Sequence, residues 1–251
     1  MRLTVIGAGN MGGALVRGWV RSGADLDISV TAKTNKTLEV LSADCPSVKV
    51  MQDNAEAARG ADVVVVAVKP WLVDNVIEGM GDALDGCKVV SVAANARNPR
   101  VDVYAMPNIA AEFGQSMTFV EDMQGGEAAG TCVETARELF SLVGGVQVVD
   151  RAHMSAGMMM AGCGIAYVMR FLRAMSEGGV EMGFYPKDAQ SIAMQTMRGA
   201  VTLLEQTGLH PEAAIDKVTT PGGVTIKGLN ELDHAGFSSA VIRCLKAGLK
   251  Q

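Results

Sequence analysis

Two hydrophobic periodicities alternate along roughly the first 150 residues of the chain. Short apolar runs rich in β-branched residues are typical of strands, and the segments between them carry apolar residues at helical spacing. Strands are predicted at residues 3–6, 26–31, 48–51, 61–68, 88–93, 101–106, 117–120 and 145–149. Helices are predicted around residues 14–20, 35–41, 71–84 and 127–142. This alternation predicts an α/β fold with a mainly parallel sheet covered by helices on both faces.

The pattern becomes purely helical after about residue 150. Helical periodicity with many small residues runs over residues 151–182, a second helix is predicted at 187–206, and others from residue 212 onward. The sequence therefore predicts an α/β domain over residues 1–152 and an all-helical domain over residues 153–251. A small helical domain rich in Gly, Ala and Met leaves apolar surface exposed. We therefore expect it to pair as a homodimer or higher homo-oligomer.

A glycine-rich turn follows the first predicted strand with the spacing G-x-G-x-x-G, formed by Gly7, Gly9 and Gly12. In such a turn the first glycine permits the tight bend, the second lets a pyrophosphate approach the backbone, and the third lets helix and strand pack closely. The N–H groups at the helix N-terminus, around Asn10 and Met11, would bind the pyrophosphate. The motif predicts a Rossmann-like dinucleotide-binding domain; the alternative is a turn that binds nothing.

The end of the second predicted strand indicates the cofactor. Enzymes that use NAD place Asp or Glu there to bind the ribose 2′-hydroxyl. This chain has no acid at that point, and Lys33 and Thr34 are available for a 2′-phosphate. NADP(H) is therefore predicted over NAD(H), although such a segment can also be a plain polar loop. Val68, Lys69 and Pro70 end the fourth strand and border the nicotinamide ribose in this interpretation, unless Pro70 only starts the next helix.

A second unusual segment, residues 219–225, reads Thr-Thr-Pro-Gly-Gly-Val-Thr. Thr220 before Pro221 predicts a helix start, with Thr220 as N-cap and Pro221 as the first helical residue. Gly222 and Gly223 in that first turn would cost roughly 1 kcal/mol each relative to alanine. Bare N–H groups and three hydroxyls suit a small carboxylate, and the alternative is a flexible helix break. The hydroxyls belong to Thr219, Thr220 and Thr225.

Composition narrows the class of protein. The net charge is −5 with no basic run, so nucleic acid is not an expected partner. Five scattered cysteines without C-x-x-C spacing and three distant histidines indicate reduced thiols in the cytoplasm and no metal site. The N-terminus is expected to be a strand rather than a signal peptide, and no membrane span is expected because no apolar run reaches about 18 residues.

Along nearly its whole length the chain resembles the pyrroline-5-carboxylate reductase family. The resemblance is carried by short segments in the same order and spacing, of which the last is the most diagnostic. They are residues 7–12, 53–54, 67–70, 106–108, 162–167, 195–196 and 218–225.

The resemblance implies NAD(P)H-dependent reduction of 1-pyrroline-5-carboxylate to L-proline on a Rossmann domain with a helical dimerisation domain. It places the substrate carboxylate on Thr220, Gly222, Gly223 and Thr225, and brings the Thr225 hydroxyl to the imine nitrogen. The resemblance also implies that Asn54, Lys69 and Pro70 border the cofactor. Ala94 and Asn108 are predicted to bind the cofactor as well. Since a cyclic imine accepts hydride readily, positioning it supplies most of the catalysis.

Departures from the family pattern leave the imine substrate open. Asn95 stands where the family has glycine, Ile109 and Ala110 replace Thr-Pro, and Ile165 replaces proline. A reductase of another cyclic imino acid and a non-catalytic NADP-binding sensor are the alternatives. A hydroxyacid dehydrogenase would carry a catalytic lysine in the turn after Gly164, and this chain has none there.

Overall fold

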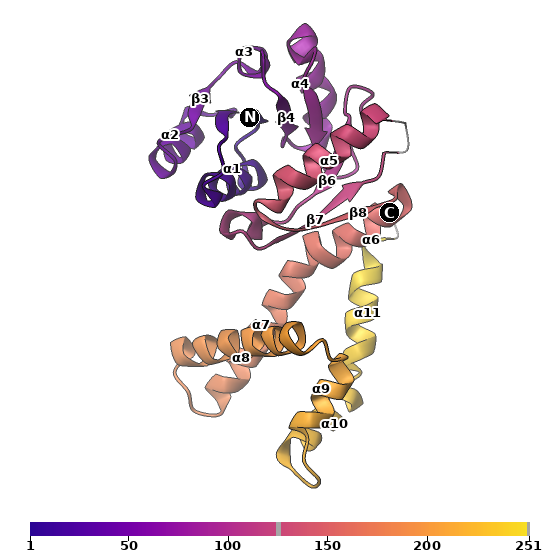
Figure 1. Cartoon of the computed structure of the whole chain (residues 1–251). Helices are drawn as coiled ribbons and strands as arrows, with labels where there is room; N and C mark the ends of the chain where they lie inside the picture. Colours follow the sequence, from indigo (N-terminus) through magenta and orange to yellow (C-terminus); the bar gives the residue numbers. More distant parts are fainter. Residues whose placement is uncertain (124–126, 250–251) are drawn as a thin grey trace. The chain divides into compact units, whose positions relative to one another are not determined.

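The computed structural model describes residues 1–123 and 127–249. The chain forms two compact units, Met1–Gly162 and Cys163–Gln251. The first unit is α/β and the second is helical, as the hydrophobic pattern predicted (Figure 1). The predicted boundary at residue 152 lies ahead of this division, because helix α6 (Arg151–Gly157) packs on strand β7: a Cβ on Gly157 would lie 2.6 Å from the Phe119 ring.

One eight-stranded sheet organises the first unit in the order β3-β2-β1-β4-β5-β6-β7-β8. Neighbouring strands are parallel except for the antiparallel pair β6 and β7, so the prediction of a mainly parallel sheet is confirmed. The strands are β1 (Arg2–Ile6), β2 (Asp27–Thr31), β3 (Lys49–Met51), β4 (Val63–Val66), β5 (Lys88–Ser91), β6 (Val103–Met106), β7 (Ser116–Glu121) and β8 (Gly144–Val149).

The helices of the first unit include those predicted, one of them divided, and add a short helix at Asn54–Ala58 for which none was predicted. They are α1 (Asn10–Ser22), α2 (Asn35–Asp44), α3 (Asn54–Ala58), α4 (Val73–Met80), α5 (Glu127–Ser141) and α6. The helix predicted at 71–84 is an α-helix flanked by 3₁₀ turns, Pro70–Leu72 and Gly81–Leu84, because Gly81 has φ +48° and ends α4. The connection from β5 to β6 contains no helix.

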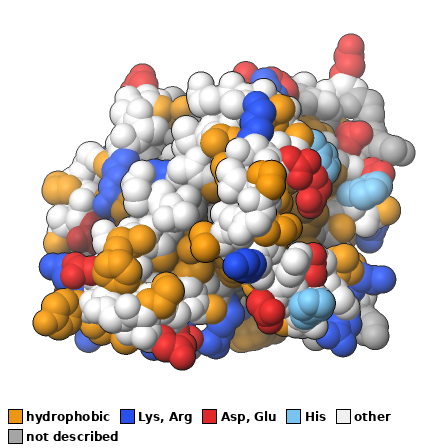
Figure 2. Space-filling model, turned by 90° about the horizontal axis from the view of Figure 1, so that it is seen from below, with side chains coloured by type: hydrophobic (Ala, Val, Ile, Leu, Met, Phe, Trp, Pro, Cys, Tyr) orange, Lys and Arg blue, Asp and Glu red, His pale blue; other side chains and the backbone are white. Residues whose placement is uncertain are grey.

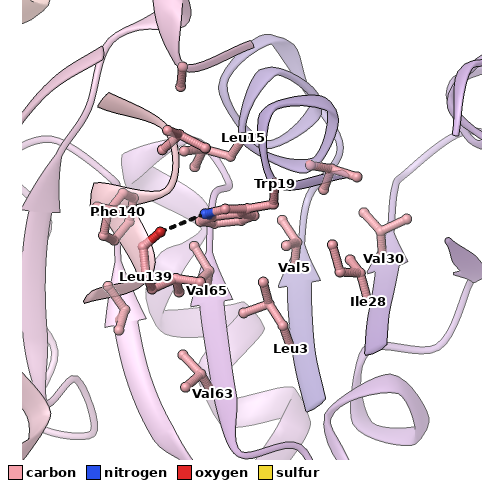
Figure 3. Packing of buried hydrophobic residues seen from close by; sticks show 14 of the residues in the cluster. Leu3, Val5, Leu15, Trp19, Ile28, Val30, Val63, Val65, Leu139 and Phe140 are labelled. Carbon is pink, nitrogen blue, oxygen red and sulfur yellow. Dashed lines mark hydrogen bonds between the residues drawn. The ribbon is translucent and has the colours of Figure 1, made fainter. Parts of the chain in front are cut away.

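Trp19 anchors the larger hydrophobic cluster of the first unit (Figure 3). Its side chain is completely buried, lies 5.8 Å from the Phe140 ring, and packs with core residues of β1 such as Leu3 and Val5. Gly18 brings α1 close to the segment Ile109–Phe113, since a Cβ there would lie 2.1 Å from the Ala111 carbonyl oxygen. Helix α1 is therefore fixed rigidly behind the glycine-rich turn.

The second unit consists of α7 (Gly164–Glu181), α8 (Pro186–Thr207), α9 (Pro211–Val218), α10 (Val224–His234) and α11 (Phe237–Ala247). A π-helical segment, Met158–Cys163, precedes α7. Helices α7 and α8 approach closely at Gly179, where a Cβ would lie 2.9 Å from the Ala189 Cβ. Phe171 of α7 contacts Phe237 of α11, with ring centroids 5.7 Å apart.

Much apolar surface of the helical unit is uncovered. Only Ala189 and Ala193 of α8 are buried, and hydrophobic side chains lie across the surface in Figure 2. The large exposed side chains of α7 and α8 include Val168, Met169, Ile192, Met194 and Val201. The helical stretch Arg151–Glu181 is long and apolar enough to cross a membrane, although it contains no unbroken apolar run of about 18 residues. One such helix is a weak indication, because a helix that pairs with another copy has the same composition.

Candidate functional site

Four strands of the first unit end in one row. Ile6 pairs with both Thr31 and Val66, and Val66 pairs with Ser91, so the chain leaves β1, β2, β4 and β5 at the same edge of the sheet. Ligands bind at this carboxyl edge in open parallel sheets. All predicted cofactor residues follow strand ends on this edge: Gly7, Gly9, Asn10, Met11 and Gly12 after β1, Lys33 and Thr34 after β2, Asn54 after β3, Val68, Lys69 and Pro70 after β4, Ala94 after β5, and Asn108 after β6.

The three glycines of the turn differ in what the fold requires of them. Gly7 has φ +104°, and a Cβ on it would lie 2.9 Å from Val68 Cγ1. A Cβ on Gly12 would lie 2.1 Å from the Gly7 carbonyl oxygen. Gly9 has φ −72°, and a Cβ there would meet no atom within 4 Å. Packing therefore explains Gly7 and Gly12, whereas Gly9 leaves open space at the start of α1.

Helix α1 begins without a side-chain cap. Gly9 is its N-cap, its first turn contains no acid, and the first helical hydrogen bond runs from Gly13 N to Gly9 O at 2.8 Å. The N–H groups of Asn10, Met11 and Gly12 precede that bond. These donors at the positive end of the helix can bind an anion such as a pyrophosphate, so the structure fits the group that the motif predicts.

Thr31, which the sequence did not single out, joins two parts of the candidate cofactor site. Its carbonyl oxygen accepts hydrogen bonds from Gly7 N at 3.0 Å and Ala8 N at 2.8 Å. Its hydroxyl donates to Asn54 Oδ1 at 2.6 Å. The glycine turn and the Asn54 side chain are thus held by one residue at the end of β2.

The segment after β2 exposes a cation. Lys33 is exposed, and Thr34 is the N-cap of α2, where its hydroxyl accepts a hydrogen bond from Thr37 N at 3.4 Å. No acid lies in the first turn of α2. The Thr34 hydroxyl therefore caps α2, besides its predicted role in binding the 2′-phosphate of NADP. Lys33 is the stronger candidate for that phosphate, because it is exposed and carries a positive charge.

The loops after β4 and β5 also carry predicted residues. Lys69 is exposed. Pro70 is the first residue of a 3₁₀ turn, so it starts a helical segment as the alternative interpretation predicted, and this position still leaves Lys69 open to a ligand. Asn95, beside Ala94, has φ +59° and is the only non-glycine residue with positive φ among those described. Asparagine tolerates this left-handed conformation, so the change from the family's glycine is compatible with the backbone found here.

Asn108 has internal partners. Only 7% of it is exposed, its Oδ1 accepts from Ala110 N at 3.0 Å, and its Nδ2 donates to Ala161 O at 3.3 Å. The side chain joins the end of β6 to the π-helical segment. A contact between Asn108 and the cofactor stays a prediction.

The loop between α9 and α10 corrects the predicted helix start. Gly223 N donates to Thr220 O at 3.0 Å, Gly222 has φ +71°, and α10 begins at Val224 with Gly223 as N-cap. The prediction that Thr220 caps the helix and that Pro221 is its first residue is therefore wrong. Pro-Gly forms the centre of a turn, where proline fixes φ and glycine supplies the positive φ. The two glycines precede the helix and do not weaken it.

The predicted substrate residues lie together in this loop of the second unit. Thr219 donates its hydroxyl to Ile215 O at 2.7 Å and closes α9, whereas Thr220 and Thr225 are exposed. A Cβ on Gly223 would lie 2.5 Å from Thr220 Oγ1. Helix α10 has no acid in its first turn, so its N–H groups can bind a carboxylate beside these hydroxyls.

One tyrosine of helix α7 has a shifted pKa. Desolvation raises the pKa of the Tyr167 phenol, and the Cys244 and Cys163 thiols raise it further, so this hydroxyl stays protonated at neutral pH. Within residues 1–123 and 127–249, no three His, Cys, Asp or Glu side chains are grouped to hold a metal ion.

Two family models match the chain, one over most of each unit. Residues 151–251 match the family model for pyrroline-5-carboxylate reductase dimerisation, and residues 2–95 match that for the NADP oxidoreductase, coenzyme F420-dependent family. A pyrroline-5-carboxylate reductase of Glycine max is 34% identical over 99% of this chain and 94% of its own length. Pyrroline-5-carboxylate reductase 1 of Dictyostelium discoideum is 33% identical over 96% of this chain, which spans 47% of that relative.

A solved structure supports the fold. The pyrroline carboxylate reductase of Plasmodium falciparum with NADP bound has a TM-score of 0.85 and 22% identity, covering 99% of this chain and 95% of that one. At this identity the likeness concerns the fold alone. The similarity to the Glycine max relative covers 99% of this chain and therefore includes both units. The chain therefore belongs to the pyrroline-5-carboxylate reductase family.

Proposed function

We propose that this protein reduces the cyclic imine 1-pyrroline-5-carboxylate to L-proline with NADPH. The observation that carries the proposal is the open space at Gly9 beside the uncapped N-terminus of α1, in a chain of this family. The glycine turn, Lys69 and Ala94 would hold the cofactor along the carboxyl edge of the sheet. The cofactor, when bound, would supply hydride to the imine carbon.

A preference for NADP(H) over NAD(H) is part of the proposal. Lys33 is exposed at the end of β2, and no acid lies between Thr31 and Lys36 to bind a free 2′-hydroxyl or repel a 2′-phosphate. The N-terminus of α2 adds favourable polarity. The presence of NADP in the Plasmodium falciparum relative supports the same choice.

The Thr219–Thr225 loop would bind the substrate. The N–H groups that begin α10 and the Thr220 hydroxyl suit a carboxylate, and Gly222 and Gly223 keep side chains out of its path. Gly223 N already donates to Thr220 O and is not available to a ligand. The donors at the start of α10 are therefore the N–H groups of Val224, Thr225 and Ile226. The Thr225 hydroxyl would donate to the nitrogen as it becomes basic during reduction.

A cytoplasmic homodimer or higher homo-oligomer completes the proposal. A groove of about 580 Å³ between α7 and α8 is lined by Met169, Leu172, Val180 and Pro186 among others. Such an uncovered apolar groove, in the segment that matches a dimerisation family, fits the helices of a second copy. Light scattering should give at least a dimer, and an active monomer at micromolar concentration would contradict this.

Turnover by the purified protein tests the activity. NADPH oxidation should be fastest with 1-pyrroline-5-carboxylate among five- and six-membered cyclic imines with and without a carboxylate. Faster turnover of another cyclic imino acid would favour the alternative substrate, for which the exposed Ile109 at a departure from the family pattern is the supporting observation. NADPH binding without turnover of any imine would favour a sensor.

A further inference from the structure

The crossover between β5 and β6 is held by side chains instead of by a helix. Residues 92–102 contain no helix or strand, yet they begin at the cofactor edge and include the turn Ala94–Asn95. The segment leading into this turn is fixed to strand β4, since Val92 N donates a hydrogen bond to Val66 O at 3.0 Å. The segment that follows the turn is fixed by contacts of Arg97 and Asn98.

Arg97 forms an ion pair with a buried carboxylate. Glu121, the last residue of β7, is only 3% exposed, and its Oε2 lies 2.5 Å from Arg97 Nη2. Among the described residues this buried oxygen has no hydrogen-bond partner, so its charge is compensated by the ion pair with the Arg97 guanidinium. Removing Arg97 alone would leave a buried charge without a partner.

Tyr104 of β6 contacts both Arg97 and Asn98. Its ring lies under Arg97, with the guanidinium carbon 3.9 Å from the ring centroid. Its hydroxyl accepts from Asn98 N at 2.8 Å and donates to Asn98 O at 3.1 Å. The Asn98 side chain donates to Asp74 Oδ1 of α4 at 2.8 Å. Arg97 and Asn98 are thus fixed on three elements, two residues after the left-handed Asn95.

We propose that Arg97 is a positioning residue for the cofactor: its pairing with Glu121 and stacking on Tyr104 hold the Ala94–Asn95 turn at the sheet edge before NADPH arrives. This inference rests on the proposed function, because it takes that edge as the cofactor site. Without the contacts of Arg97 to Glu121 and Tyr104, residues 92–102 would have to become ordered when NADPH binds. The entropy lost in that ordering would weaken the affinity for NADPH.

Arg97→Met, Glu121→Gln and the double variant test the proposal by direct NADPH titration and by kinetics. Arg97→Met should raise the Kd and KM for NADPH about tenfold, with a smaller change in kcat at saturating NADPH. Arg97→Lys keeps the charge without the planar stack and should recover part of the affinity. The double variant, which has no unpaired buried charge, should regain thermal stability but keep the weak NADPH binding.

Arg100→Met is the matched control, because Arg100 lies on the same crossover but pairs with the exposed Asp85 at 3.0 Å. Its NADPH Kd should stay within about twofold of the wild-type value. Unchanged NADPH binding in both Arg97→Met and the double variant would overturn the proposal and leave the pair a stability element. If Arg97→Met does not fold, the double variant alone decides.

Binding measured without any imine separates this inference from the proposed function. A wild-type protein that binds NADPH but reduces no imine would contradict the function, while weaker binding in the variants would still support the inference. A wild-type protein that binds neither NADPH nor NADH would overturn both.

Discussion

Trp19 Nε1 donates a hydrogen bond to the Leu139 carbonyl oxygen at 2.9 Å, across 120 residues of sequence (Figure 3). The bond links α1, which begins at the glycine turn, to α5, which returns the chain to β8. Both residues are almost completely buried. The helix that starts at the glycine turn is therefore anchored in the core by Trp19, near its C-terminal end.

Replacing Trp19 with Phe should destabilise the protein. The change removes the indole donor and leaves a gap in the core, at a combined cost of roughly 2–4 kcal/mol. Urea unfolding of the purified protein measures it. Trp71→Phe is the control, because Trp71 is 75% exposed and should change stability by less than about 0.5 kcal/mol. Equal losses in the two variants would contradict the assigned role of Trp19.

Alanine at Gly9 and at Gly12 should have opposite signatures. Gly9→Ala should keep near wild-type stability, since its Cβ meets no protein atom within 4 Å, but should weaken NADPH binding at least about tenfold. Gly12→Ala should lose stability, since its Cβ would lie 2.1 Å from a backbone oxygen. Thermal melts with and without NADPH distinguish the two. A normal NADPH affinity in Gly9→Ala would contradict the prediction that NADPH binds at this turn.

Lys33→Glu should reduce or reverse the preference for NADPH over NADH. A charge-assisted hydrogen bond to the 2′-phosphate is worth roughly 1.5–3 kcal/mol, so the ratio of the two kcat/KM values should move more than tenfold. Lys246→Glu, at an exposed position on α11, makes the same charge change as a control. A ratio that moves equally in both variants, or in neither, would refute the assignment of Lys33.

Thr225 and Gly223 should affect different kinetic constants. Thr225→Ala should lower kcat by roughly a hundredfold, because a proton donor to the nitrogen matters most as hydride arrives. Gly223→Val should raise the substrate KM, because its Cβ displaces Thr220 and narrows the approach to the N-terminus of α10. Neither change should alter the Kd for NADPH. A near-normal kcat in Thr225→Ala would identify water or a protonated imine as the proton source.

The carboxylate of Asp150 should make stability depend on pH. It caps α6 by accepting from His153 N at 2.9 Å, and contacts with the His153 side chain and backbone lower the pKa of Asp150. A lowered pKa in the folded state stabilises the fold above the unfolded pKa of about 3.9 and loses that effect as pH falls below it. The difference in Tm between wild type and Asp150→Ala should therefore be largest near neutral pH and shrink at acid pH. A constant difference would contradict this.

Periodicity predicted the central strands β1, β4, β5 and β6 well because almost all of their residues are buried, so their apolar runs are continuous. The run at residues 61–68 became β4, and only its length differed, since strand ends depend on pairing partners that the sequence does not reveal. The predicted helix at 71–84 failed at Gly81, where a positive φ overrode the apolar spacing.

The candidate site was predicted unevenly for similar reasons. The local motif identified Gly7 and Gly12, where an added Cβ would contact Val68, Ala67 and the Gly7 backbone, and it also identified Gly9, where an added Cβ would meet no atom within 4 Å. Thr31 and Arg97 escaped notice because their partners, Asn54 and Glu121, lie 23 and 24 residues away and meet them only through the folded sheet. The Thr220 cap was mispredicted because Pro-Gly can open a helix or form a turn, and only the chain's path distinguishes these.

The alignment of strand ends at Ile6, Thr31, Val66 and Ser91 also makes cofactor binding a measure of folding. The row exists only when β1, β2, β4 and β5 are all paired in register, so a chain with any of them detached has no complete site. A ligand that binds only the intact sheet raises the free energy of unfolding, by about 2.7 kcal/mol at a hundred times its Kd. NADPH at a given multiple of its Kd should therefore raise the free energy of unfolding of any destabilised variant by the same amount, provided that the folded variant keeps the row of strand ends and binds NADPH as the wild type does.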